Sequence, residues 1–414
     1  MKKLILIMAL GLFFASCSQD EGIVAPTDTE TTKTSGLCRT PEEAIAVADN
    51  FLAAVCPNSR SEQRRVATVD IIGSHGSRSS SDTLMYAINY KDNNGFVLVS
   101  AARTGLDVIG YDPEGELNLE EYGNEAFNFY MECAKEYVAS ELSITPVPIP
   151  DPTPKDYTIT MSVEPKLTVS WGQVNPEGLY CPNGVAGCLQ TAMAQAMSYL
   201  EQPTSINLTY YNRDVDTQVL DWADIKNHVI SSNYAGQAYL NIHAGFCNAS
   251  MDAHKALGRL CRQLGELNEA FYIMKNDSIP PATGALTEKG YATFKSLVPG
   301  AVKKVLTYFN DTRQNMLTDM ASCQGIAILE GFTAGGAGHA WVADGGHNIQ
   351  TIAYGVGIDG EMITTYINKD CYYHFNWGWN GSCNGYFAGG VFNSDTPLSR
   401  NNYDRNVRYF VVAK

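Results

Sequence analysis

Cys188 is the residue whose surroundings best suit covalent chemistry. It follows Gly187 directly and begins the helix-forming run CLQTAMAQAMSYL. A thiol at a helix N-terminus feels the positive end of the helix dipole, which favours the thiolate, the nucleophilic form. A buried structural cysteine is the plainer interpretation, and this segment alone does not decide between the two.

His339 offers such a thiol a basic partner. It stands where the glycine-rich run GFTAGGAG meets the apolar run HAWVADGG, at the expected start of a strand. A general base needs a fixed backbone and an open approach, and this position provides both. A core histidine is the alternative. Among the other histidines, only His374, beside Asn376, is a second candidate for a place near a site.

Two further segments hold polar side chains that a Cys–His pair needs. Gln173, in the run WGQ, precedes the cysteine by a loop, and its amide could join the Cys188 N–H in binding a developing oxyanion. Asn376, in the run HFNWGWNG, could accept the imidazole N–H, with Trp377 shielding that hydrogen bond from water. An ordinary loop residue and an aromatic-rich hairpin are the plainer interpretations.

The N-terminal third of the chain predicts a small α+β unit. A helix is expected from Thr40, in TPEEAIAVADNFLAAV, and another over residues 119–142. Between them LMYAINY, GFVLVSA and LDVIGY predict strands. The run SITPVPIPDPTPKD follows, and its alternating prolines exclude a helix or a central strand. Such a connector is either a proteolytic site or a plain spacer.

The remaining residues, 158–414, predict helices first and strands later. AHKALGRLCRQLGEL is the clearest helix, and GIAILEGF, HAWVADGG, EMITTYI and CYYHFNWGW are strand-like. This order indicates an α+β fold with two lobes. Residues 355–360 match the pattern G-x-G-x-x-G, but a strand-like run follows where a dinucleotide site needs a helix. We therefore interpret them as a hairpin turn.

The first residues indicate export. Lys2 and Lys3 precede an apolar run over residues 4–14, which is typical of a secretory signal. The run FASC is similar to a bacterial lipobox, in which Cys17 would be acylated; an ordinary signal peptide is the alternative. We expect a signal peptide over residues 1–16 and a polar tether over residues 17–36. The protein would be an exported bacterial lipoprotein of the outer membrane, or secreted after maturation.

Composition excludes some classes of function. The net charge is −15, and no cluster of Lys and Arg suggests nucleic-acid binding. Residues 18–157 carry −13 of this charge, so the rest of the chain is only mildly acidic. The eleven cysteines show no C-x-x-C pair and no zinc-like spacing, and the acidic residues show no EF-hand spacing. We expect no metal and no cofactor; which cysteines pair is not indicated.

Taken together, these motifs resemble the streptopain family of secreted bacterial cysteine proteases. The resemblance runs through GFVLVSA and VIGY, then VEPKLTVSWGQ, GCLQTAMAQAM, TGALTEK, GHAWVADGG and HFNWGWNG, in that order. It implies a papain-like, two-lobed α+β fold preceded by a small α+β propeptide that inhibits the enzyme. The propeptide is expected over residues 37–142, an activation linker over 143–157 and the catalytic domain over 158–414.

The same resemblance implies roles for individual residues. Cys188 would be the nucleophile and His339 the base, and Gln173 matches the glutamine of the family's W-x-Q segment. Ala285 and Gly338 match positions that line the substrate cleft, and Asn376 and Trp377 match the N-W-G-W run. The sequence departs from the family in two places. PEGLY soon follows Gln173 where Pro-Tyr-Asn is usual, and Leu189-Gln190 replaces Val-Ala, so specificity is the property most affected.

The expected function is a cysteine endopeptidase made as a zymogen. It would act on proteins or peptides, with a preference for a hydrophobic residue two positions before the cut, and its own propeptide would inhibit it. Maturation is expected between residues 145 and 169, and contact with a membrane only through the lipid anchor. Two alternatives remain: an acyltransferase or transglutaminase-like enzyme with the same Cys–His chemistry, and a non-catalytic surface-binding lipoprotein on the same fold.

Overall fold

The computed structural model describes most of the chain after residue 37. The described ranges are 38–57, 64–74, 82–119, 124–143, 155–210, 216–229, 249–276, 279–309, 315–333, 338–356, 361–392 and 407–414. The expected signal peptide, the tether with Cys17 and most of the proline-rich linker lie outside them. Among the described helices, none is both long and apolar enough to cross a membrane.

Within its described residues, the N-terminal region, residues 38–143, holds the two predicted helices and the three predicted strands in order, and before those strands a further strand, Val66–Gly73, that the sequence does not predict. The first helix is capped as expected: the Thr40 side chain accepts from the Glu43 N–H, and the Glu43 carboxylate accepts from the Thr40 N–H. The elements are α1 (Pro41–Val55), β1 (Val66–Gly73), β2 (Thr83–Tyr90), β3 (Phe96–Ser100), β4 (Val108–Asp112) and α2 (Glu125–Ser143), with a short 3-10 turn, η3 (Lys91–Asn93), between β2 and β3.

The second helix of this region begins later than the apolar pattern predicts. Leu119 lies in a turn, and α2 starts at Glu125. Asn124 sets this start, because its side-chain oxygen accepts from the Phe127 N–H at 3.1 Å. A side chain that satisfies a free N–H of the first turn is what begins a helix.

The C-terminal region, residues 155–414, separates helices from sheet. Its helices are α3 (Cys188–Leu200), α4 (Trp222–His228), α6 (Ala249–Leu267), α7 (Thr287–Leu297) and α8 (Asn315–Cys323). Its strands are β5 (Lys155–Val163), β6 (Ser205–Asn207), β7 (Thr217–Val219), β8 (Phe271–Ile273), β9 (Ala282–Gly284), β10 (Val302–Tyr308), β11 (Ile326–Phe332), β12 (Gly338–Val356), β13 (Met362–Asn376), β14 (Gly385–Ala388) and β15 (Arg408–Val412), with the 3-10 turn η6 (Gly389–Phe392).

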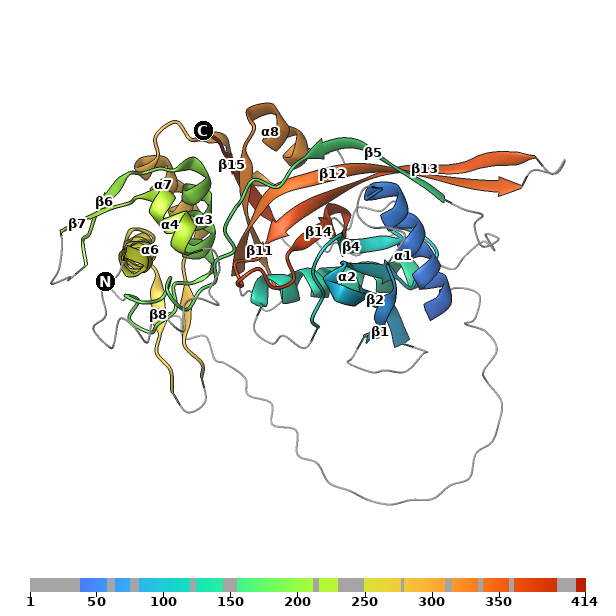
Figure 1. Ribbon diagram of the computed structural model, residues 1–414, viewed down its shortest axis with the longest axis horizontal. Coiled ribbons are helices and arrows are strands. Elements are labelled where there is room, and N and C mark those ends of the chain that lie inside the picture. Colours follow the sequence, from blue (N-terminus) through green and yellow to red (C-terminus); the bar gives the residue numbers. More distant parts are fainter. Residues whose placement is uncertain are drawn as a thin grey trace, which may run out of the picture. The chain divides into compact units, whose positions relative to one another are not determined.

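Two buried cores confirm the predicted two lobes. One core joins α3, α4, α6 and α7 to one face of the sheet. The other lies among the long strands and includes residues of α1, α2 and β2 to β4. In Figure 1 the helices α3, α4, α6 and α7 stand together on one side of β11 and β15, and the long strands β12 and β13 lead away from them. The fold is therefore α+β, as the sequence predicts.

Strands of both regions belong to one large sheet. Its strand order is β1-β2-β3-β4-β14-β13-β12-β11-β15-β10, and β5 pairs with β12. The junction is the antiparallel pair β4–β14, where Tyr111 faces Tyr386 and Gly110 faces Phe387. The sequence predicts a small α+β unit before the catalytic domain, and in the structure this unit shares its sheet with that domain. Pairing β4 with β14 satisfies two edges that would otherwise stay open.

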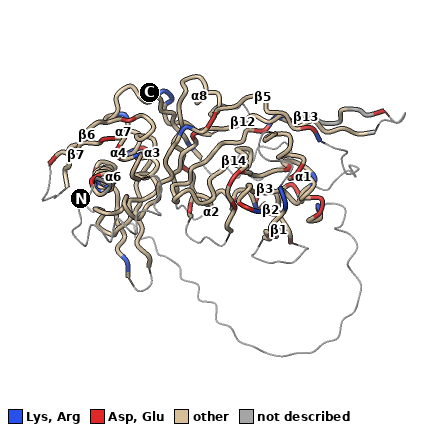
Figure 2. Tube along the Cα trace, viewed as in Figure 1, with Lys and Arg blue, Asp and Glu red and all other residues tan. Residues whose placement is uncertain are grey.

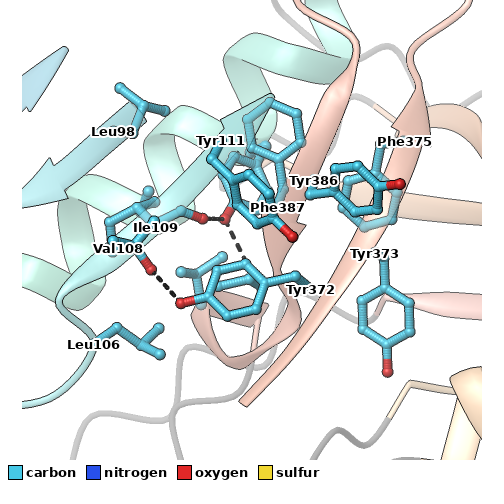
Figure 3. Close-up of a cluster of buried hydrophobic side chains, with 14 of the residues drawn as sticks. Leu98, Leu106, Val108, Ile109, Tyr111, Tyr372, Tyr373, Phe375, Tyr386 and Phe387 are labelled. Atoms are coloured by element: carbon cyan, nitrogen blue, oxygen red, sulfur yellow. Dashed lines mark hydrogen bonds between the residues drawn. The ribbon is translucent and has the colours of Figure 1, made fainter. Parts of the chain in front are cut away.

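Side chains from both regions pack together at this junction. Figure 3 shows Val108, Ile109 and Tyr111 of the N-terminal region beside Tyr372 and Phe387 of the C-terminal region. The Tyr372 hydroxyl donates to the Val108 carbonyl at 2.8 Å. The N-terminal region is thus part of the same hydrophobic core.

The run that matches G-x-G-x-x-G joins two strands. β12 ends at Val356 and β13 begins at Met362, and the two pair in an antiparallel register along most of their length. Residues 357–360 lie outside the described part, but a strand follows them, which confirms the hairpin interpretation over the dinucleotide site. β13 also merges the two runs EMITTYI and CYYHFNWGW, which the sequence analysis treats as separate strands.

Candidate active site

Cys188 is the first residue of α3, as the sequence predicts. Gly187 caps the helix with φ 94° and ψ 154°, a conformation that L-residues with side chains rarely adopt. A Cβ at this position would also lie 3.0 Å from the Thr283 carbonyl oxygen. The glycine therefore lets the chain turn tightly beside β9 and presents the half-buried Cys188 thiol at the N-terminus of α3.

His339 lies near the start of β12, opposite Gly331 of β11. Its side chain is largely buried, and its Nδ1 atom lies 3.3 Å from Glu125 Oε2, an ion-pair distance without the alignment of a hydrogen bond. Burial acts to lower the pKa of His339, but the side-chain interactions with Cys188 and Glu125 outweigh it and raise this pKa to about 9. The imidazolium is thus the favoured form at neutral pH, next to the thiol.

Gln173 is held beside the nucleophile helix by its backbone. The Gln173 carbonyl accepts from the Ala186 N–H at 2.7 Å, and the Gly172 carbonyl accepts from the Thr191 hydroxyl of α3 at 2.9 Å. The Gln173 side chain is mostly buried and reaches the wall of a cleft. The structure therefore brings Gln173 to the same end of α3 as Cys188.

The cleft has a volume of about 540 Å³. It is lined by Glu125, Gln173, Val174, Asn175, Gly178, Leu179, Asn183, Gly184, Val185, Pro281, Ala282, Thr283 and Trp379. The two expected cleft positions, Ala285 and Gly338, are not among these residues. Ala285 follows β9 and packs against the helical core, and Gly338 pairs with Phe332 at the start of β12.

Asn376 and Trp377 make hydrogen bonds away from His339. The Asn376 amide donates to the Val169 carbonyl at 3.0 Å, and its oxygen accepts from the Gly378 N–H at 3.1 Å. The Trp377 indole N–H donates to the Cys383 carbonyl at 2.7 Å, and its ring packs on Phe127 of the N-terminal region. Both residues brace the loop that carries Trp379 into the cleft.

His374 is engaged elsewhere. Its Nδ1 atom lies 2.6 Å from Asp344 Oδ1, and the other Asp344 oxygen accepts backbone N–H groups of Lys166 and Leu167. Burial acts to lower the pKa of His374, but the Asp344 carboxylate outweighs it and raises this pKa. Through Asp344, His374 therefore links β13 to the segment after β5.

Glu125 lies at the cleft and contacts His339, although its place there is not predicted from the sequence. It is the first residue of α2, and the preceding Asn124 amide donates to the Ser382 carbonyl at 3.2 Å. The sequence carries only a weak signal for it, a carboxylate at a helix start, because nothing local connects that helix to His339.

The distribution of charged residues and the state of the cysteines are the remaining features of the described residues. In Figure 2 the Lys and Arg residues are scattered among Asp and Glu over the described residues. The nine cysteines within these residues form no disulfide with one another.

Comparisons with known proteins agree with this arrangement. The family "Peptidase C10 family" matches residues 170–387, and "Spi protease inhibitor" matches residues 38–138. No curated protein matches the chain. A fragment of prointerpain A from Prevotella intermedia has a similar fold, with a TM-score of 0.53 and 16% identity over 84% of this chain and 99% of that one.

The peptidase match spans more than half of the chain and contains both Cys188 and His339. The inhibitor match covers the N-terminal region, whose Glu125 contacts His339. The chain belongs to the Peptidase C10 family and is a cysteine protease made as a zymogen.

Proposed function

We propose that the chain is a streptopain-like endopeptidase in which Cys188 is the nucleophile and His339 the general base. The observation that carries this is the interaction of His339 with Cys188 at the start of α3. The helix dipole favours the thiolate, and the raised pKa of His339 favours the imidazolium. An ion pair of this kind attacks peptides without a prior proton transfer from the thiol.

The reaction is an acyl transfer. The Cys188 sulfur bonds to the peptide carbonyl carbon, and the oxyanion is stabilised by the Gln173 amide together with the Cys188 N–H. His339 donates its proton to the departing amine as the C–N bond breaks. It then takes a proton from a water molecule, which attacks the thioester and releases the second product with the free thiol.

The cleft supports binding of an extended peptide beside the nucleophile. Val174 at its wall is about half exposed, and Leu286, next to Ala285, is 64% exposed. We propose that Ala285 and Gly338 flank the subsite for the residue two positions before the cut, and that this subsite takes an apolar side chain. Asn376 and Trp377 support the loop that carries Trp379.

The N-terminal region acts as an intramolecular inhibitor in this proposal. Glu125 stands in the substrate cleft and against His339, so a peptide and α2 compete for the same space. We place the propeptide over residues 37–142, after a signal peptide over 1–16 and a tether over 17–36 anchored through Cys17. The anchor would hold the exported protein at the outer membrane until maturation.

β5 narrows the expected maturation site. This strand runs from Lys155 to Val163 and pairs with β12, which also pairs with β13. A protease needs an extended, accessible segment, and β5 is tied into the sheet. We therefore move the start of the catalytic body from residue 158 to Lys155 and expect cleavage within residues 145–154. Sequencing the N-terminus of the mature protein checks this, and a start inside β5 would contradict it.

The proposed activity is tested with the precursor lacking residues 1–16. After maturation it should hydrolyse casein and label at Cys188 with a thiol-directed inhibitor, and Cys188→Ala should lose both properties. Protein that matures but neither labels nor cleaves would refute the assignment. Aminated rather than hydrolysed products, in the presence of an added amine, would favour the transferase alternative.

A further inference from the structure

Glu177 is a fully buried carboxyl group close to the catalytic cleft. It lies in the PEGLY run that distinguishes this sequence, and its residue surface is 0% exposed. One oxygen, Oε1, accepts from the Gly172 N–H at 3.2 Å, and the other, Oε2, has no hydrogen-bond partner among the described residues. A buried carboxylate without a cationic partner costs far more free energy than the neutral acid does.

The Glu177 side chain accepts a hydrogen bond from the segment that carries Gln173. Gly172 is held on its carbonyl side by Thr191 of α3 and on its N–H side by Glu177. Gln173 follows directly, and its carbonyl is bonded to Ala186. Glu177 is therefore the one titratable group among the three contacts that fix this segment. All three contacts lie within the C-terminal region, so they persist after the N-terminal region is removed.

Among the described residues, the titratable neighbours of Glu177 carry no positive charge that would stabilise its carboxylate. The Cys181 thiol donates weakly to the Glu177 carbonyl, and Cys261 of α6 is the other titratable neighbour. Burial raises the pKa of both thiols, that of Cys181 to about 12, so they are neutral near pH 8. Within the described residues no Lys or Arg forms an ion pair with Glu177, and burial raises the pKa of Glu177 to about 8.

We propose that Glu177 is a positioning residue for peptide cleavage, which holds the Gly172–Gln173 segment in its catalytic place as the neutral acid and releases it when ionised. An ionised Glu177 must draw in water or leave its site, and either movement shifts the Gly172 N–H and with it Gln173. The proposal rests on the role of Gln173 as oxyanion donor. It adds a second loss of activity at alkaline pH, separate from the titration of His339.

The test compares pH profiles of kcat/KM for enzyme matured from the full precursor. With a pKa of about 8, only about one molecule in ten keeps the Glu177 proton at pH 9, so the wild type should lose about tenfold between pH 7 and pH 9. Glu177→Gln keeps an acceptor for the Gly172 N–H and cannot ionise. Its loss over this range should be less than about threefold. The same loss as in the wild type would overturn the proposal.

A second readout separates positioning from a general effect on the fold. A peptide aldehyde forms a tetrahedral adduct that needs the oxyanion site, whereas alkylation of Cys188 by iodoacetamide does not. From pH 7 to pH 9 the wild type should lose about tenfold in aldehyde affinity beyond any change in the alkylation rate, and Glu177→Gln should not. Parallel changes in both readouts would overturn the proposal.

Two further variants distinguish the possible failures. Gln173→Ala should weaken aldehyde binding at every pH; if it does not, the oxyanion assignment itself fails. If it does and Glu177→Gln still shows the wild-type profile, only the role of Glu177 fails. Glu269→Gln, on the same lobe with a largely exposed carboxylate paired to Lys289, is the matched control and should keep the wild-type profile.

Discussion

At the scale of single residues, the zymogen holds His339, the proposed general base, between two partners. Cys188 comes from the start of α3 and Glu125 from the start of α2, and both raise the pKa of His339 against the effect of burial. A raised pKa means that the contact with Glu125 is fully present at neutral pH and is lost as pH rises through about 9. In the proposed mechanism, the same imidazolium contacts Glu125 in the precursor and takes part in catalysis after maturation.

Replacing Glu125 by Gln should weaken latency. The variant loses the ion pair to His339, so the precursor should mature faster. Because the Glu125 side chain is 57% exposed, the ion pair contributes at most about 1 kcal/mol to holding the precursor in its latent form. The increase in the maturation rate is therefore limited to about fivefold. The measurement is the rate of precursor loss on a denaturing gel at pH 7. Glu132→Gln, on the same helix and exposed, is the control and should mature at the wild-type rate.

At the scale of elements, the active site is assembled where helix ends meet strand ends. The proposed nucleophile, Cys188, begins α3. The proposed base, His339, lies near the start of β12, and β9 runs beside the turn at Gly187. Residues close together in the sequence determine where each of these elements begins, through a cap, a glycine or an apolar pattern. Their meeting point depends on the glycine, because a side chain there would press on the Thr283 carbonyl.

Gly187→Ala should lower the kcat of the folded enzyme in addition to its stability. Its φ of 94° costs a residue with a side chain about 1 to 3 kcal/mol, and relief of that strain would move Cys188 out of line with His339. We expect kcat per folded molecule to fall at least about tenfold. The rate of casein cleavage, divided by the enzyme concentration from active-site titration, measures it. Gly300→Ala is the control: it has φ 84° with open space around it, so it should cost stability alone. Equal kcat values for the two variants would argue against this role of Gly187.

At the scale of the whole molecule, the inhibitor region and the peptidase share one sheet and one core. Asp107 bridges them: it forms an ion pair with Arg39 in the N-terminal region and lies 2.6 Å from Lys155 Nζ of β5. Burial acts to raise the pKa of Asp107, but Arg39 and Lys155 outweigh it and lower this pKa. The Tyr111 hydroxyl crosses the same junction and lies 2.7 Å from His347 Nδ1. Release of the N-terminal region therefore breaks polar as well as apolar contacts.

Mild acid should loosen this junction through His347. Burial lowers the pKa of His347, so its neutral form is favoured while the regions are joined, and that stability is lost as pH falls below about 6.5. Protonation of His347 places a charge in this buried site beside the Tyr111 hydroxyl, and the desolvation of that charge lowers the stability of the junction. The nearby charges are Glu164, which opposes the shift, and His374, which adds to it.

The measurement is the urea midpoint of the Cys188→Ala precursor at pH 7.5 and pH 5.5. His347→Gln should lose less stability over this range than its parent, because Gln does not titrate. Asp107 does not interfere, since a lowered pKa places its titration below about pH 4. His228→Gln, at a partly exposed histidine paired with Asp224, is the control and should follow the parent. An unchanged pH dependence in His347→Gln would refute the prediction.

The sequence by itself determined the features that depend on neighbours along the chain. The cap at Thr40, the glycine before Cys188 and the strand that begins near His339 are local. The order of helices and strands predicted the fold class, and the series of motifs around Gln173, Cys188 and His339 predicted the family. Only the tertiary structure decided contacts between distant segments. Glu125 meets His339 although more than 200 residues separate them, and Asn376 bonds to Val169 rather than to the imidazole. Such contacts depend on how β4 pairs with β14 and how β12 lies in the sheet, and strand pairing is set by the packing of the whole core rather than by local sequence.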